Sequence, residues 1–302
     1  MNASAEPTLI VIAGPTAVGK TRVAIEVAKH LKTEIVSADS RQCYSGMAIG
    51  TAQPDIHELN EVPHHFINCF SPEVALSAAD FERIALAHLE DLFLRNNTAV
   101  VCGGTGLYIK ALCEGLDEMP PVIDAINASV NKEYLEKGID WLKATLQKND
   151  PEFFVKGEGE NPARMLRALT FYLSNGQSIH SFRTGLKKKR PFRIIKIGLE
   201  LPRDLLYQRI NIRVEKMIED GLIQEAQNLY SLRHLKNLNT VGYTELFDYF
   251  EGKISLPVAI DKIKQHSRNY AKRQLTWFKK DNSFHWTMAD NPDILKEILN
   301  FL

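Results

Sequence analysis

The sequence predicts an α/β fold in which a doubly wound parallel sheet carries an all-helical insertion domain. Strand-like apolar segments alternate with helical ones in the first part of the chain, and a glycine-rich turn directly follows the first of them. Between about residues 122 and 182 only helical patterns occur, before strand character returns. We therefore expect a core formed by residues 1–119 and 186–302, with a helical domain inserted at 120–185.

The composition is typical of a soluble globular protein. Of the 302 residues, 44% are hydrophobic and 25% are charged, which excludes a disordered or collagen-like chain. No apolar run approaches the length of a membrane-spanning helix, and the first residues lack the basic start of a signal peptide. The four cysteines form neither a C-x-x-C pair nor a metal-finger spacing. We therefore expect a cytoplasmic protein with no membrane partner.

The apolar segments of the first part are short and bounded by turn residues, as expected of buried parallel strands. Between them, apolar residues at four-residue spacing and a capping box formed by Ser77 and Asp80 indicate helices. The predicted order is strand 8–13, a helix through Val23, Val27 and Leu31, strand 34–37, a helix from 77 to about 96, and strand 98–102.

The insertion and the remainder of the chain are mainly helical. Asn161 and Pro162 provide an N-cap followed by a proline at the first helical position, and Asn175-Gly176 ends that helix. The predicted order is helices 124–136, 139–148 and 161–175, strand 193–199, then helices 203–220, 222–232, 242–250 and 257–280.

A glycine-rich motif follows the first strand. Its sequence, GPTAVGKT, fits G-x-x-x-x-G-K-[ST] at every fixed position and opens a helix, which predicts a P-loop NTPase-like core. Backbone N–H groups and the helix N-terminus would hold a diphosphate, the lysine would neutralise its oxygens, and the threonine hydroxyl could bind Mg²⁺. The motif indicates a pyrophosphate group without specifying a nucleotide. Its residues are Gly14, Pro15, Thr16, Ala17, Val18, Gly19, Lys20 and Thr21.

Two further polar segments are predicted at the same edge of the sheet. Asp39 follows the second strand, where its carboxylate could accept a proton from a nucleophile or hold a metal through water. The segment 103–106 (GGTG) follows the third strand, where glycines permit close backbone approach and Thr105 could meet phosphates. Each segment also has a simpler interpretation: a turn or helix cap for Asp39, and a tight strand-to-helix turn for the glycines.

Positive charge is concentrated locally, although Lys+Arg and Asp+Glu both number 37. Six basic residues and no acid lie between 183 and 193, and seven basic residues against one acid lie between 258 and 280. Such stretches suit a polyanion, and solvated surfaces are the alternative interpretation. On the C-terminal helix the predicted basic stripe consists of Lys264, Arg268, Lys272 and Lys279.

Two residue pairs complete the candidates. Arg209 and Arg213 are four apart on one predicted helix, so they could clamp a leaving pyrophosphate, although exposed arginines at this spacing commonly have no special role. His64 and His65 are adjacent and point apart in any extended segment, so we interpret them as structural rather than as metal ligands.

Further segments complete a family pattern. In chain order they are SADSRQ (37–42), MAIGTAQPD (47–55), VPHHFIN (62–68), LSAADF (76–81), GGTGLY (103–108), NPARMLRAL (161–169), VGYTEL (241–246) and YAKRQLTWFK (270–279). With the P-loop, they resemble the bacterial tRNA dimethylallyltransferases (tRNA isopentenyltransferases, the IPP transferase family) from about residue 9 to 286. That family transfers a dimethylallyl group from dimethylallyl pyrophosphate to N6 of adenosine 37, in tRNAs that read codons beginning with U, and releases pyrophosphate.

The resemblance implies a role for each site. The P-loop would hold the donor diphosphate rather than ATP, with Mg²⁺ at Thr21 as cofactor. Asp39 would be the general base, and Thr105 and Arg213 would act on the diphosphate and its departure. tRNA would be the partner of a monomeric enzyme. The implied tRNA contacts are Asp39, Ser40, Arg41, Gln42, Thr105, Asn127, Ala163, Arg164, Met165, Leu166, Arg167, Asn239, Thr240, Val241, Gly242, Tyr243, Thr244, Lys272, Arg273, Gln274, Leu275, Thr276, Trp277, Phe278 and Lys279.

Three positions depart from the family pattern. Gln53 stands where relatives commonly carry lysine, Asn127 where some carry arginine, and Ser267 where threonine is usual. The first two concern phosphate contacts, and none concerns the chemistry.

Three other functions compete on the sequence alone. A P-loop small-molecule or nucleotide kinase shares the strand–loop–helix start but does not account for the basic C-terminal helix. A non-catalytic RNA-binding module has no use for Lys20 and Thr21. A prenyltransferase acting on free adenine nucleotides is a closer rival, but the helical insertion and the basic C-terminus favour tRNA.

Overall fold

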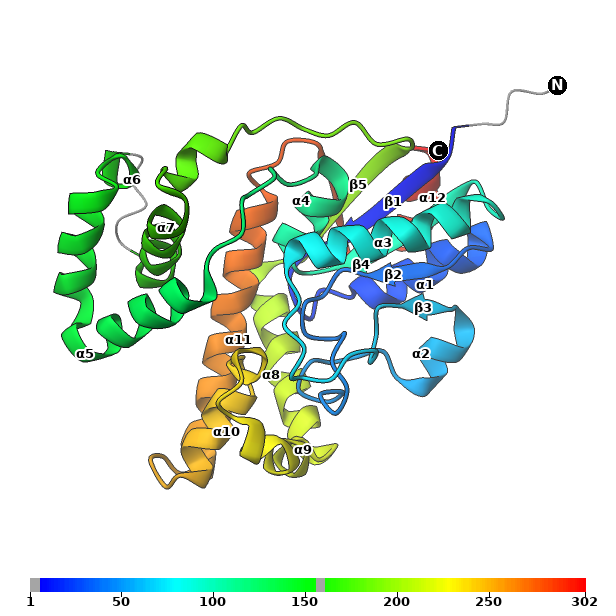
Figure 1. The fold of residues 1–302 in the computed structure, drawn as a ribbon. Coiled ribbons are helices and arrows are strands. Elements are labelled where there is room, and N and C mark those ends of the chain that lie inside the picture. Colours follow the sequence, from blue (N-terminus) through cyan, green and yellow to red (C-terminus); the bar gives the residue numbers. More distant parts are fainter. Residues whose placement is uncertain (1–5, 156–160) are drawn as a thin grey trace. The chain divides into compact units, whose positions relative to one another are not determined.

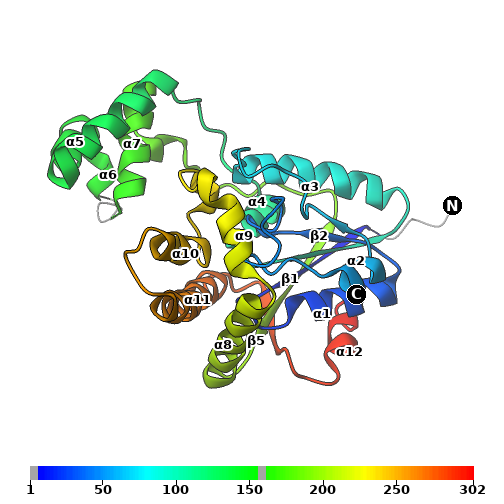
Figure 2. The ribbon, with the colours of Figure 1, turned by 90° about the horizontal axis from the view of Figure 1, so that it is seen from below.

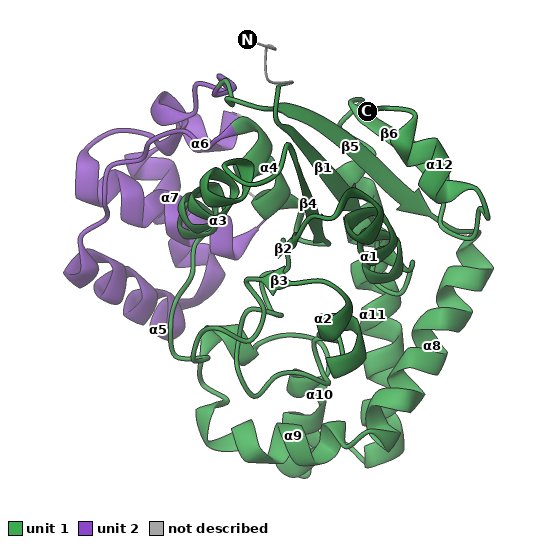
Figure 3. Ribbon diagram, turned by 90° about the vertical axis from the view of Figure 1, so that its right-hand side faces the viewer, with its two compact units in different colours: residues 1–114, 189–302 green, residues 115–188 purple. Residues whose placement is uncertain are grey.

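The computed structural model describes residues 6–155 and 161–302. The chain divides into two compact units, one formed by residues 1–114 and 189–302 and the other by residues 115–188 (Figure 3). The second unit extends a few residues beyond each end of the segment 120–185 in which the sequence shows only helical patterns. Within the described residues, no helix is both long enough and apolar enough to cross a membrane.

The first unit is built on six parallel strands in the order β3–β2–β4–β1–β5–β6 (Figure 1). The central strand β1 pairs with β4 on one side and β5 on the other, and every residue of β1 is buried. This sheet confirms the predicted doubly wound α/β fold. The strands are β1 (Thr8–Ala13), β2 (Ile35–Ser37), β3 (His64–His65), β4 (Thr98–Gly103), β5 (Arg193–Glu200) and β6 (Phe284–Met288).

Alternate residues of β1 enter separate cores on the two faces of the sheet. Leu9 and Val11 pack in the cluster that holds α3 and α4, whereas Ile10 and Ile12 pack in the cluster that holds α1, α8 and α12. The helices of this unit are α1 (Lys20–Leu31), α2 (Ile56–Glu61), α3 (Ala78–Phe93), α4 (Gly106–Glu114), α8 (Arg203–Glu219), α9 (Leu222–Leu229), α10 (Tyr243–Phe250), α11 (Leu256–Phe278) and α12 (Ile294–Leu299).

Four helices lie together beyond the carboxyl ends of the strands (Figures 1 and 2). In this group α8 contacts both α9 and α11, and α10 contacts the same two helices. Since β1, β2 and β4 are parallel, the loops that follow them also open toward this side.

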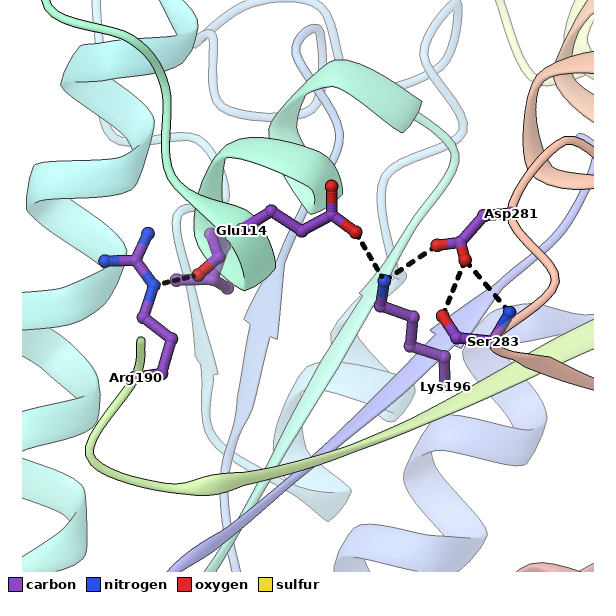
Figure 4. Close-up of polar contacts among 6 residues, drawn as sticks. Glu114, Arg190, Lys196, Asp281 and Ser283 are labelled. Carbon is purple, nitrogen blue, oxygen red and sulfur yellow. Dashed lines mark hydrogen bonds and ion pairs between the residues drawn. The ribbon is translucent and has the colours of Figure 1, made fainter. Parts of the chain in front are cut away.

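An ion cluster around the buried Lys196 joins α4, β5 and the turn that follows α11 (Figure 4). Lys196 on β5 lies 2.7 Å from Asp281 and 3.3 Å from Glu114. Burial alone would raise the pKa of Asp281, but hydrogen bonds from Lys196 and Ser283 outweigh it and lower that pKa to about 2. Arg190 donates to Leu112 O and pairs with buried Glu82 at 2.7 Å. This arginine of the predicted basic stretch 183–193 is therefore used inside the fold.

The second unit has its own small core. α5 (Asp124–Asn149), α6 (Glu152–Val155) and α7 (Pro162–Asn175) bury Leu142, Leu146, Phe153, Leu169 and Phe171 in one cluster. The helices predicted at 124–136 and 139–148 are two parts of α5, because Gly138 interrupts it with φ 75° and ψ −168°. Asn161 caps α7 through Arg164 N as expected, and Gly176 ends the helix in the left-handed region.

Candidate active site

A cleft of about 1170 Å³ opens at the carboxyl edge of the sheet. It is lined by the loops after β1 and β2 and by the end of β4. Residues of α8, α10, α11 and the segment before α10 also line it. It brings together, among the sequence-predicted residues, Thr16, Ala17, Gly19, Lys20, Thr21, Asp39, Ser40, Arg41, Gln42, Arg213, Asn239, Thr240, Val241, Gly242, Thr244, Arg273 and Gln274.

The P-loop bends back on itself between β1 and α1. Gly14 allows the loop to pass close to the backbone of β5, because a Cβ at this position would lie only 2.7 Å from Leu199 O. Gly19, at φ 106°, turns the chain into α1. Lys20 Nζ donates to Pro15 O at 2.8 Å across the loop. Burial lowers the pKa of Lys20 to about 8, against the opposing influence of the nearby Cys102 and Asp39.

Asp39 is fixed by the turn that follows β2. Its Oδ1 accepts the N–H of Arg41 at 2.9 Å and that of Gln42 at 3.4 Å, so the turn-cap interpretation of this residue is part of the geometry. No hydrogen bond to Oδ2 is found among the described residues, and the side chain lines the cleft. The carboxylate is thus oriented through Oδ1, while Oδ2 has no hydrogen bond from the described residues.

The 103–106 segment connects the loop after β2 to α11. Thr105 N donates to Ala38 O at 3.2 Å, and Thr105 Oγ1 accepts from Ser40 N at 3.0 Å. A Cβ on Gly103 would lie 2.2 Å from Ala38 O, and one on Gly106 would lie 2.1 Å from the Trp277 ring. The glycines are therefore required by close approach to neighbouring segments, in addition to any approach by a ligand.

Both predicted arginines of α8 reach the P-loop. Arg213 Nη1 donates to Thr16 Oγ1 at 3.4 Å, and Arg209 Nη1 donates to Val18 O at 3.5 Å. Arg213 lines the cleft, whereas Arg209 does not. The desolvation of Arg213 lowers its pKa. The structure thus brings Lys20 and Arg213, two cationic side chains, to the same cleft beside the P-loop.

The basic stripe predicted on α11 is divided between two directions. Lys264 pairs with Glu215 of α8 at 2.7 Å, and Arg268 donates to Asn211 of α8 at 2.7 Å. These two residues therefore pair with α8 and are not free for a ligand. Lys272 is exposed, and Lys279 makes an exposed pair with Glu200.

The predicted RNA-contact residues differ in exposure, and several of them, such as Leu166 and Leu275, are half-buried. Lys272, Arg273, Thr276, Trp277 and Lys279 are exposed on α11, and Ala163, Arg164 and Arg167 are exposed on α7 of the second unit. Asn127 is also exposed and accepts a hydrogen bond from Asn131. Others are buried, namely Met165, Tyr243, Gln274 and Phe278, although Gln274 still lines the cleft.

Two side chains, those of Gln53 and Glu225, hold the loop 42–53 in place through hydrogen bonds. Gln53 Nε2 donates to Gln42 O and Tyr44 O, both at 2.9 Å, so this departure from the family pattern is used within the loop. Glu225 of α9 accepts the N–H groups of Ile49 and Gly50 and the Tyr243 hydroxyl, at 2.8–2.9 Å and 2.6 Å. Sequence reasoning missed Glu225, because an acid on an amphipathic helix carries no distinguishing signal.

Comparisons with known proteins agree with this geometry. The family model described as IPP transferase matches residues 42–281. The chain belongs to the IPP transferase family. A tRNA dimethylallyltransferase of Christiangramia forsetii is 49% identical over 282 residues, which cover 93% of each chain. A second relative, tRNA dimethylallyltransferase 1 of Phocaeicola vulgatus, is 45% identical over 98% of this chain and 97% of its own.

Solved structures of this family share the fold over most of their length. The full-length tRNA isopentenylpyrophosphate transferase of Bacillus halodurans gives a TM-score of 0.72 at 36% identity, covering 98% of this chain and 95% of its own. A eukaryotic dimethylallyltransferase acting on tRNA gives a TM-score of 0.76 at 25% identity, covering 94% of this chain and 74% of its own. The IPP transferase fold therefore includes the P-loop, which lies outside the matched range of the family model.

Proposed function

We propose that this chain is a tRNA dimethylallyltransferase, which transfers a dimethylallyl group from dimethylallyl pyrophosphate to N6 of adenosine 37 and releases pyrophosphate. The observation that carries the proposal is that one cleft of an IPP transferase chain is lined by both the P-loop and Asp39. The tRNAs that it modifies are those that read codons beginning with U. The protein acts as a monomer in the cytoplasm.

Asp39 is the general base of the proposed reaction. The lone pair of the adenine amine is delocalised into the ring, so the amine is a weak nucleophile and needs a positioned acceptor for its proton. The two backbone N–H groups on Oδ1 orient the carboxylate, which leaves Oδ2 for the substrate. As the N–C bond forms and the allylic C–O bond breaks, the proton passes to Asp39 and the electron pair leaves with pyrophosphate.

Lys20, Arg213 and the P-loop amides neutralise the departing charge. Cations and backbone N–H groups at the site of developing negative charge lower the barrier more when water is excluded. Thr105 Oγ1 accepts the N–H of Ser40, the residue that follows Asp39, although Thr105 is not among the residues that line the cleft. Adenosine 37 must leave the stack of its loop to enter such a cleft.

Mg²⁺ fits the residues present at this site. The first turn of α1 supplies the Thr21 hydroxyl, and Asp39 lines the same cleft. The described residues contain no cluster of three or more side chains suited to holding a metal by themselves. That arrangement suits Mg²⁺, which is commonly bound by few protein oxygens together with substrate phosphates and water. When bound, Mg²⁺ would supply further neutralisation of the diphosphate.

Nucleoside analysis tests the proposal. The protein is incubated with labelled dimethylallyl pyrophosphate, Mg²⁺ and a tRNA that carries adenosine 37, and the digested nucleosides are separated. We expect label only in N6-dimethylallyladenosine, no label in the same tRNA with guanosine 37, and loss of transfer when Mg²⁺ is chelated. Label transferred to free AMP but not to tRNA, or γ-phosphate transfer from ATP in place of prenyl transfer, would overturn it.

A further inference from the structure

Gln274 lies in the segment of α11 that the family resemblance assigns to tRNA contact, yet its side chain points into the protein. It is 6% exposed, whereas its neighbours Lys272 and Arg273 are exposed. Its carbonyl oxygen accepts the N–H of Thr16 at 2.8 Å, and its amide nitrogen donates to Gly104 O at 2.9 Å. A single side chain of α11 therefore joins the P-loop to the 103–106 segment.

Gly104 is shaped to admit this amide. A Cβ on Gly104 would lie 2.2 Å from Gln274 Nε2, while the nearest atom from another residue, Gly14 O, would be 3.7 Å away. Gly104 is not among the glycines with positive φ, so its backbone does not require glycine. The need for glycine at this position comes from Gln274.

The two segments that Gln274 joins carry the chemistry of the anion site. Lys20 and Thr21 belong to the P-loop, and Thr105 follows Gly104 directly. The same face of α11 also places Trp277 against Gly106, and the Tyr270 hydroxyl interacts with the side chain of Thr105. A glutamine is suited to the central position because its amide offers one acceptor and one donor, and here each has a partner.

We propose that Gln274 is a positioning residue for the donor diphosphate and makes no contact with RNA. It holds Thr16 N and Gly104 O at a fixed separation, so that a diphosphate meets the P-loop and Thr105 already arranged and need not order them on binding. This inference rests on the proposed function, which identifies the anion of the cleft as the diphosphate of the prenyl donor.

The first test compares Gln274→Met with Gln265→Met. Methionine has a similar length but neither donates nor accepts a strong hydrogen bond, and Gln265 is an exposed glutamine of α11 outside the cleft. Titration with Mg²⁺-pyrophosphate should show at least tenfold weaker binding to Gln274→Met. The affinity for an anticodon stem-loop RNA should stay within twofold of wild type. Gln265→Met should match wild type in both measurements.

The second test is a double-mutant cycle, which also covers the case that Gln274→Met fails to fold. Gly104→Ala alone should reproduce the loss of pyrophosphate affinity by displacing the amide. In a Gln274→Ala background the same change should have little further effect, because the nearest remaining atom to the new methyl group is then Gly14 O at an ordinary 3.7 Å. Thermal unfolding of each variant identifies the folded ones.

Three results would overturn the inference. The first is weaker RNA binding with unchanged pyrophosphate binding in Gln274→Met. The second is unchanged pyrophosphate binding in both Gln274→Met and Gly104→Ala. The third is additive effects of Gly104→Ala and Gln274→Ala in the cycle. Pyrophosphate binding requires no turnover, so these outcomes are distinct from failure of the proposed function, which would appear as wild-type protein that transfers no prenyl group to tRNA.

Discussion

Lys20 should make donor binding depend on pH near neutrality. Burial holds the pKa of this ammonium at about 8 instead of its usual 10.5. The protonated fraction of Lys20 in the free protein then falls from about 90% at pH 7 to about 10% at pH 9. Because the diphosphate is attracted to the ammonium and not to the neutral amine, donor affinity should fall about tenfold over this range. The bound anion raises the pKa of Lys20, so binding above pH 8 should take up a proton.

Calorimetry without RNA measures this effect in the absence of turnover. Dimethylallyl pyrophosphate is titrated into the protein at pH 7, 8 and 9, and buffers with different ionisation enthalpies report proton uptake. The second pKa of a phosphate monoester is about 6, so the ligand itself changes little in this range. Lys20→Met should bind weakly and with a flat pH profile. Wild-type affinity that stays within twofold from pH 7 to 9, or an equal fall in Lys20→Met, would refute the reasoning.

Two further variants, one single and one double, separate chemistry from RNA docking. Asp39→Asn should lower the single-turnover rate by roughly 10²–10⁴-fold with RNA and donor affinities nearly unchanged, and a rate within threefold of wild type would remove Asp39 as the base. Lys272→Ala combined with Lys279→Ala should flatten the slope of log RNA affinity against log salt by about one to two units, since each phosphate contact contributes about 0.7–0.9. Lys264→Ala, whose ammonium faces Glu215 on α8, is the matched control and should leave that slope nearly unchanged. An unchanged slope in the double variant would show that this face of α11 is not the docking surface.

Long elements and the P-loop could be predicted because their signals are local. The strand at 8–13, the capping box at Ser77 and the cap at Asn161 depend on neighbours in sequence, and the structure has each of them. β3 was missed because two residues cannot display a period, and β6 because its five residues offer only a weak alternation. The helix after the glycines at 103–106 was anticipated only as the second part of a strand-to-helix turn, and its bounds, Gly106–Glu114, come from the structure.

The partners of the site residues could not be predicted, because they depend on contacts between distant parts of the chain. The sequence indicates that Asp39 and Thr105 lie at one sheet edge, but not that Ser40 N joins the two loops. It places Gln274 in an RNA-contact motif, whereas the fold turns this side chain toward Thr16, 258 residues away in sequence. A sequence motif shows which residues occur together in a family. It does not show which of them contact the ligand and which hold the ligand-binding residues in place.

The distinction between residues that contact a ligand and residues that are used inside the fold also explains how a chain with no net charge can bind a polyanion. Several of its basic residues are used internally: Arg190 against Glu82, Lys196 against Asp281, and Lys264 against Glu215. Exposed pairs such as Lys279 with Glu200 contribute little to stability, so a phosphate can replace the carboxylate at small cost. RNA affinity in this protein should therefore depend on a few cations of α11 and α7 with weak or exchangeable partners, and not on a global positive field. Counting basic residues along the sequence overestimates this set, because burial removes some of them from the surface.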